Sequence, residues 1–206
     1  MERQQHLSLF ELAKAYVLHT KRDIFLTGRA GTGKTTFLKY IKEQTSKNIV
    51  ILAPTGVAAI NAGGMTMHSF FQLPFGPFIP GQRQAFTSLP SEGTDLPTLL
   101  KNIRFNKEKR KLLEELELLV IDEASMLRAD MLDAVDGILR HFRKKPEQPF
   151  GGVQMLYIGD LHQLPPVVSD SEWSNLRRWY KSMFFFDALV FQEAQPVYIE
   201  LDKIYR

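Results

Sequence analysis

A glycine-rich loop offers the clearest chemistry in this sequence. Residues 28–35 read Gly-Arg-Ala-Gly-Thr-Gly-Lys-Thr, which fits the pattern G-x-x-x-x-G-K-[ST] of a phosphate-binding loop. A buried-strand pattern at residues 23–26 precedes the loop, and a helical pattern with one apolar face follows at residues 34–44. Such a turn aims backbone N–H groups and the positive end of a helix dipole at one point, where phosphates bind. A chance match on a tight turn is disfavoured because motif and context agree.

Two side chains of this loop have distinct expected roles. Lys34 is a mobile positive charge that can reach the β- and γ-phosphates, and Thr35 can supply a hydroxyl to Mg²⁺. The glycines permit a positive φ and a close approach of the backbone to phosphate oxygens. The residues expected to bind the nucleotide are Gly28, Ala30, Gly31, Thr32, Gly33, Lys34, Thr35 and Thr36.

Two adjacent carboxylates follow a second apolar run. Residues 118–121 are all apolar, and Asp122 and Glu123 come next. At the carboxyl end of a buried strand beside the phosphate loop, Asp122 can hold the water shell of Mg²⁺. Glu123 can act as the general base on the water that attacks the γ-phosphate. Most adjacent Asp-Glu pairs are solvated surface, but the apolar strand and the chain order favour the catalytic interpretation.

A polar turn follows a third apolar run, at residues 159–166 after residues 153–158. Gln163 is the natural sensor of a γ-phosphate there, because its amide both donates and accepts hydrogen bonds. Asp160 is either a partner of the site or a plain turn residue, and the sequence leaves both interpretations open.

Strands and helices that alternate along the chain must position these groups. The strand candidates are residues 24–26, 48–53, 118–122, 153–158, 184–186 and 197–200. A helix is expected at residues 9–20, and an apolar stripe at Leu127, Met131, Val135, Ile138 and Phe142 predicts another, with Asp130 as its N-cap. Continuous apolar strands between helices are typical of an α/β fold with a mostly parallel sheet.

Composition sets wide limits on function. The 206 residues carry a net charge of +3, which permits a polyanionic partner without requiring one. With no cysteine and five scattered histidines, zinc is disfavoured and Mg²⁺ is the expected metal. No signal peptide and no apolar run near the ~18 residues of a membrane span are visible, so a cytoplasmic protein is expected.

One long connection stands apart from this pattern. Residues 74–97 are rich in proline and glycine without a clear period, and a basic run follows at residues 101–111. A connection of this length is usually functional or mobile. A functional segment and a disordered surface loop both remain open here.

Several segments together resemble the PIF and RecD-like branch of superfamily 1B DNA helicases. The matching segments are residues 28–36, 53–61, 67–70, 121–126 and 159–167, and the resemblance runs from about residue 24 to residue 206. This family moves 5′-to-3′ on single-stranded DNA, driven by ATP, with two RecA-like domains. The resemblance implies that residues 1–206 are the first RecA-like P-loop NTPase domain, a three-layer α/β fold, with residues 74–111 as an insertion that contacts the fork.

The resemblance also implies a DNA-binding surface. Thr55 and Gly56 would touch the DNA backbone, and Thr66, His68, Ser69 and Phe70 would line the DNA groove. Hydroxyls and backbone N–H groups bind phosphates without reading sequence, and an aromatic ring can stack on a base. For Phe70 core packing is the alternative, and for His68 a structural role.

The resemblance also implies the partners and the setting of the protein. The implied partners are single-stranded and forked duplex DNA, bound by a monomer. Such a protein would act in repair, recombination or telomere maintenance and, in a bacterium, would be associated with the nucleoid.

Two features depart from the family pattern. Gln4 and Gln5 are the only upstream glutamines that could read the adenine, and their spacing is uncertain. The chain also stops at Arg206, which matches the start of a motif whose arginine contacts the γ-phosphate. The second RecA-like domain and its arginine finger would be absent. We therefore expect a piece of a longer protein that binds Mg-ATP, hydrolyses it slowly and unwinds nothing alone.

Two other classes of function remain as alternatives. A different P-loop ATPase acting as a DNA-associated switch would fit the Asp-Glu strand, but it does not explain the matches at residues 53–61 and 159–167. A binding module without turnover would have no need of the general base Glu123. A GTPase is disfavoured because the sequence holds no Asn-Lys-x-Asp guanine-reading motif.

Overall fold

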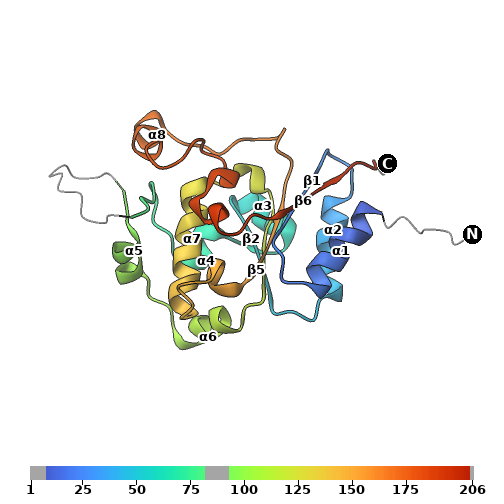
Figure 1. Cartoon of the computed structure of the whole chain (residues 1–206), viewed down its shortest axis with the longest axis horizontal. Coiled ribbons are helices and arrows are strands. Elements are labelled where there is room, and N and C mark those ends of the chain that lie inside the picture. Colours follow the sequence, from blue (N-terminus) through green and yellow to red (C-terminus); the bar gives the residue numbers. More distant parts are fainter. Residues whose placement is uncertain (1–7, 82–92, 205–206) are drawn as a thin grey trace, which may run out of the picture.

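A parallel sheet lies at the centre of the molecule, with helices around it (Figure 1). It has six strands, in the order β3-β2-β4-β5-β1-β6. The computed structural model describes residues 8–81 and 93–204. The strands are β1 (Ile24–Gly28), β2 (Ile49–Ala53), β3 (Met65–Thr66), β4 (Leu118–Ile121), β5 (Gln154–Ile158) and β6 (Val197–Leu201). The predicted parallel α/β sheet is therefore confirmed.

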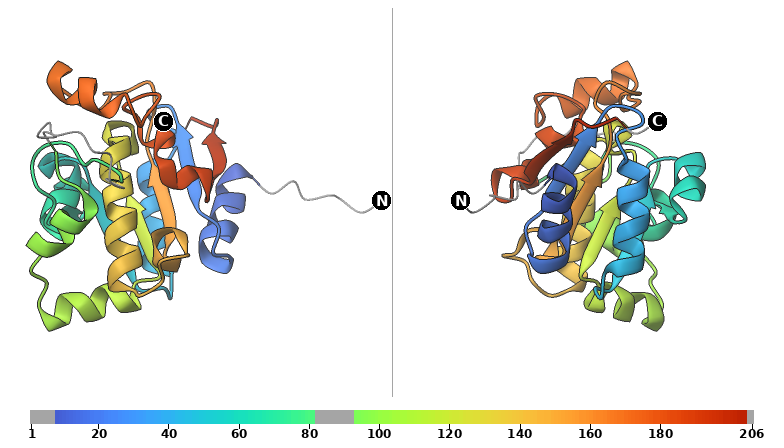
Figure 2. Two further views of the ribbon diagram at one scale, coloured as in Figure 1. Left: turned by 60° about the vertical axis from the view of Figure 1, so that its left-hand side comes forward. Right: turned by 90° about the vertical axis from the view of Figure 1, so that its right-hand side faces the viewer.

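Helices cover both faces of this sheet (Figure 2). The α-helices are α1 (Leu9–His19), α2 (Lys34–Gln44), α3 (Gly56–Ala62), α4 (Met67–Phe71), α5 (Leu96–Asn102), α6 (Lys107–Glu115), α7 (Ala129–Phe142) and α8 (Asp170–Leu176). Short 3₁₀ turns are η1 (Ala124–Met126), η2 (Pro149–Gly152), η3 (Phe185–Asp187) and η4 (Leu189–Gln192).

Alternate residues of each central strand enter two separate cores. In β1, Ile24 and Leu26 pack with α1 and α2, whereas Phe25 packs into the core that contains α7. Every residue of β1, β4 and β5 is buried. Because both faces are covered, these strands read as continuous apolar runs in the sequence. Within the described residues, no helix is long and apolar enough to span a membrane.

Two local predictions were wrong. Residues 184–186 do not form a strand: Phe184 makes only an isolated bridge to Arg128, and the next residues form η3. The reason is ring packing, since the fully buried ring of Phe185 stacks on Tyr157 of β5 at 5.2 Å and so lies above the sheet. Nor does Asp130 cap α7. Arg128 occupies the N-cap position, and Asp130 is buried in the first turn.

The long connection between β3 and β4 is largely structured where it is described. Residues 101–111, predicted only as a basic run, fall mostly in α5 and α6, whose Leu99 and Leu113 enter the core around α7. Residues 77–79 run beside Thr94, which accepts a hydrogen bond from the N–H of Ile79 at 3.0 Å. The remainder of the predicted irregular segment, residues 82–92, lies outside the described residues.

Candidate nucleotide and DNA site

The phosphate-binding loop connects β1 to α2 in a conformation that requires glycine. Gly28, Gly31 and Gly33 have φ values of 146°, 82° and 99°. A Cβ on Gly28 would lie 2.6 Å from the carbonyl oxygen of Leu201, so no other residue fits there. Thr32 closes the turn by donating its hydroxyl to the carbonyl of Arg29 at 2.8 Å. The predicted strand–loop–helix unit is therefore present.

Lys34 begins α2 and folds back over this loop. Its ammonium group donates hydrogen bonds to the carbonyls of Gly28 and Arg29, the second at 3.1 Å. The next two residues of α2, Thr35 and Thr36, are exposed. Ala30 and Gly31 are also exposed, whereas Thr32 is buried and Gly33 is half-buried. A cation and a hydroxyl therefore lie on adjacent residues at the start of α2.

Asp122 and Glu123 follow β4 at this carboxyl edge of the sheet. Burial raises the pKa of Asp122, and the hydrogen bond from the Glu123 N–H and the charge of Lys34 oppose that shift. Lys34 and Asp122 therefore lie within electrostatic reach, although β5 separates their two strands. Glu123 adopts a left-handed conformation with φ of 53°. Such a conformation is strained for a glutamate and is often found at functional sites.

Asp160 orients Gln163 after β5. The Gln163 amide donates to one carboxylate oxygen of Asp160 at 3.2 Å, and the N–H of His162 donates to the other at 3.0 Å. Asp160 is buried and Gln163 is exposed. The same turn packs on the residues after Glu123, because a Cβ on Gly159 would lie 3.0 Å from the nitrogens of Ala124 and Ser125. Asp160 is thus both a turn residue and the partner of Gln163.

The side-chain oxygens at the carboxyl edge of the sheet are suitable ligands for a magnesium ion. Mg²⁺ is usually held by one or two carboxylates together with substrate phosphates and several waters. Asp122 and the exposed hydroxyl of Thr35 offer such a partial set. Among the described residues there is no group of three or more His, Cys, Asp and Glu side chains that could enclose a metal by itself.

The predicted DNA-binding residues lie on α3 and α4 or directly before these helices. Thr55 caps α3 and Thr66 caps α4 through their hydroxyl oxygens, which accept from backbone N–H groups three residues ahead. Gly56 and Ser69 are exposed, and no atom lies within 4 Å of a Cβ built on Gly56. Burial followed by the charge of Arg128 lowers the pKa of the half-buried His68.

The expectation that Phe70 stacks on a base is not compatible with the structure. Its ring is only 3% exposed and packs edge-on against Phe71 in the core. The ammonium group of Lys109, from α6, covers the ring, and burial lowers the pKa of that lysine to about 8. For this residue the alternative of core packing is therefore correct.

A cavity of about 340 Å³ lies beside the segment that is predicted to bind DNA, and the sequence did not indicate it. Its lining is Pro54, Thr55, Met67, His68, Leu73, Phe75, Gly76, Met126, Leu127, Arg128, Met131, Val167 and Glu172. The cavity therefore joins the segments that follow β2, β3, β4 and β5.

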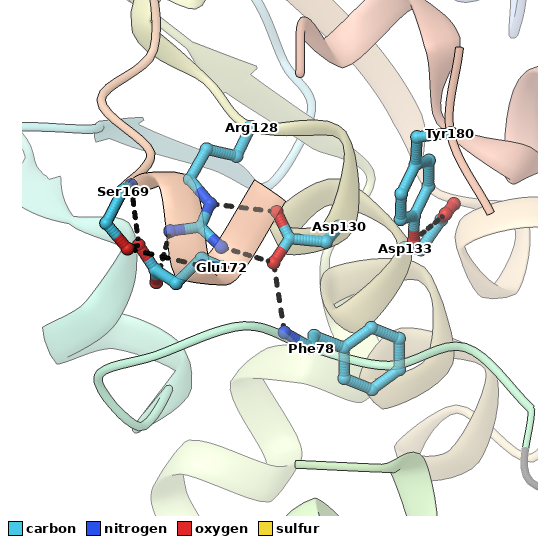
Figure 3. A network of polar contacts seen from close by, with 7 residues as sticks. All are labelled: Phe78, Arg128, Asp130, Asp133, Ser169, Glu172 and Tyr180. Carbon is cyan, nitrogen blue, oxygen red and sulfur yellow. Dashed lines mark hydrogen bonds and ion pairs between the residues drawn. The ribbon is translucent and has the colours of Figure 1, made fainter. Parts of the chain in front are cut away.

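An ion-pair network holds these walls together (Figure 3). Arg128 donates to both carboxylate oxygens of the buried Asp130, at 2.9 and 2.8 Å, and to Glu172 of α8 at 3.1 Å. Asp130 also accepts the N–H of Phe78 at 2.9 Å. Glu172 completes a capping box with Ser169, a pattern that the sequence does contain. No sequence pattern indicated the ion pairs of Arg128, because folding alone brings their partners together.

Comparison with known proteins identifies the family. The model of PIF1-like helicases matches residues 1–183. The chain belongs to this family. It is 35% identical over 189 residues to the ATP-dependent DNA helicase PIF1 of Saccharomyces cerevisiae, covering 89% of this chain and 19% of that protein.

Solved PIF1-like helicases share the fold. The Pif1 helicase from Bacteroides in complex with ADP-AlF3 and single-stranded DNA matches with a TM-score of 0.82 at 41% identity, over 100% of this chain and 43% of that one. A structure of two coordinating Pif1 helicases at forked double-stranded DNA matches with a TM-score of 0.83 at 41% identity, over 100% and 45% of the two chains. The chain thus spans less than half the length of these relatives. The predicted RecA-like fold is confirmed, while Arg206, Gln4 and Gln5 lie outside the described residues.

Proposed function

We propose that this chain carries the ATP-hydrolysing machinery of a 5′-to-3′ DNA helicase. The observation that supports the proposal is that the segments with Lys34, Glu123 and Gln163 each follow one of three neighbouring parallel strands, β1, β4 and β5. Lys34 binds the β- and γ-phosphates, Glu123 takes the proton of the attacking water, and Gln163 senses the γ-phosphate. Asp122 and the hydroxyl of Thr35 would hold Mg²⁺, which would neutralise charge on the phosphates.

Single-stranded DNA is the proposed polymer substrate, with forked duplex DNA as the substrate for unwinding. The names of the relatives, ATP-dependent DNA helicases, support this choice. The residues proposed to contact the DNA backbone are Thr55, Gly56, Thr66, His68 and Ser69, and residues 74–111 form the insertion next to the fork. A second RecA-like domain is needed for unwinding, and Arg206 supplies a further contact to the γ-phosphate. We propose a monomer that works in the cytoplasm or on the nucleoid, in repair, recombination or telomere maintenance.

ATP hydrolysis measured with and without single-stranded DNA tests this function. We expect slow hydrolysis by the 206 residues and strong stimulation by DNA when a second RecA-like domain is present. Lys34→Ala should lower kcat/KM for ATP by about 10²–10³-fold, the usual cost of losing one donor that stabilises developing charge. Lys39→Ala, an exposed lysine on the same helix, is the matched control and should hydrolyse ATP normally. If DNA does not stimulate hydrolysis by the two-domain protein, the helicase assignment is wrong and a P-loop ATPase switch takes its place.

A further inference from the structure

Phe75 stands at the mouth of the cavity with its ring almost wholly in solvent. The side chain is 95% exposed, and its ring stacks on the imidazole of His68 with centroids 5.6 Å apart and planes 18° apart. Val167, which also lines the cavity, is 82% exposed. A single exposed apolar residue is ordinary, but two that line one cavity mark a binding surface.

The interior of the cavity suits a neutral, flat group. Three methionines, Met67, Met126 and Met131, contribute to its walls, and their polarizable sulfurs make favourable contacts with aromatic rings. The charge of Arg128 is engaged by Asp130 and Glu172. Burial lowers the pKa of His68 and so keeps its imidazole uncharged at neutral pH. The volume of about 340 Å³ is at the lower end for ligand sites, enough for one small ring system.

Groups that bind phosphates without reading sequence lie next to this cavity. Thr55 is one of its lining residues, and the exposed Ser69 follows His68 on α4. A neutral ring attached to a chain of phosphates is a nucleotide within a single strand. An aromatic side chain of a partner protein would use the apolar walls but would make no use of the exposed Ser69.

We propose that the cavity receives one nucleobase of the bound single strand, which stacks on Phe75 in front of His68. This inference rests on the proposed function for its choice of polymer. Stacking on a ring face and contact with methionine sulfurs accept every base, so the site holds the strand in place without selecting its sequence. Phe75, and not the buried Phe70, is then the stacking phenylalanine of this segment.

Scanning a strand for one essential base tests the proposal. Oligothymidylates that each lack a single base, at successive positions, are titrated against the protein, and binding is followed by fluorescence anisotropy. Wild type should lose about tenfold in affinity at one position only, as expected for one stacked base and equal to about 1.4 kcal/mol. Phe75→Ala should bind intact DNA about tenfold more weakly and show no sensitive position. Phe75→Trp should restore both the affinity and the single sensitive position, because a larger ring can stack.

Two controls separate this proposal from the proposed function. Phe186→Ala removes another exposed phenylalanine outside the cavity lining and should leave the profile unchanged. If Thr55→Ala weakens DNA binding but Phe75→Ala keeps wild-type affinity and the wild-type profile, the base site is wrong and the DNA function stands. If wild type binds no single-stranded DNA at all, both are wrong.

Discussion

The carboxyl edge of the sheet and the cavity beside it are assembled in different ways. At the edge, Lys34, Glu123 and Gln163 each sit in a short motif directly after their own strand, so backbone geometry places them. The walls of the cavity come from the segments that follow four different strands, and they are held by the ion pairs of Arg128 with Asp130 and Glu172. Changes at the edge should therefore alter chemistry, whereas changes in the network should alter stability.

The largest effect on stability is expected from Arg128→Ala. This change leaves Asp130, which is 1% exposed, as an unpaired buried charge and should lower the free energy of unfolding by about 3–5 kcal/mol. Urea denaturation measures the loss. Lys111→Ala is the control, because its pair with Glu115 is exposed and should contribute no more than about 1 kcal/mol. Equal losses of unfolding free energy in the two variants would mean that the ion pairs of Arg128 do not hold the cavity walls together.

A smaller effect, confined to turnover, is expected from Asp160→Ala at the carboxyl edge. Without the carboxylate that orients its amide, Gln163 should sample unproductive positions. We expect kcat to fall about tenfold while KM for ATP changes by less than about twofold. Steady-state kinetics separate these two constants. His162→Ala, which keeps its backbone bond to Asp160, is the control and should retain wild-type kcat. A rise in KM with unchanged kcat would contradict a positioning role.

An effect that appears only as the pH changes is expected at the opposite, amino edge of the sheet. Burial raises the pKa of Asp23 from 3.8 to about 7. The folded protein therefore holds a proton that the unfolded chain releases, and stability falls as pH rises through that interval. Asp23→Asn cannot ionise and keeps an acceptor for the N–H of Met155. Relative to wild type, its free energy of unfolding should gain about 1 kcal/mol for each pH unit between pH 4 and 7, with unchanged ATP turnover. A parallel pH dependence in the two proteins would contradict this account.

The same contrast explains what the sequence could predict. The sequence predicts the central strands because burial on both faces leaves continuous apolar runs. It predicts the phosphate loop because the glycines of the motif are needed where φ is positive. Strand order was not readable, so the placement of β5 between β1 and β4 came only from the structure. Phe70 and Phe75 are identical in type, and the packing of Lys109 and α6 decides which ring is buried. The N-cap prediction for Asp130 was wrong for the same reason, because the contact of Asp130 with Arg128 exists only after folding.

The most direct test of the account is the substitution Glu123→Gln. The amide keeps the size of the side chain but cannot accept the proton of the attacking water. ATP affinity, measured by equilibrium titration, should stay within about threefold of wild type, while single-turnover hydrolysis should fall by about 10²-fold or more. Hydrolysis at the wild-type rate would contradict the assignment of Glu123 as the base and would place the chemistry elsewhere.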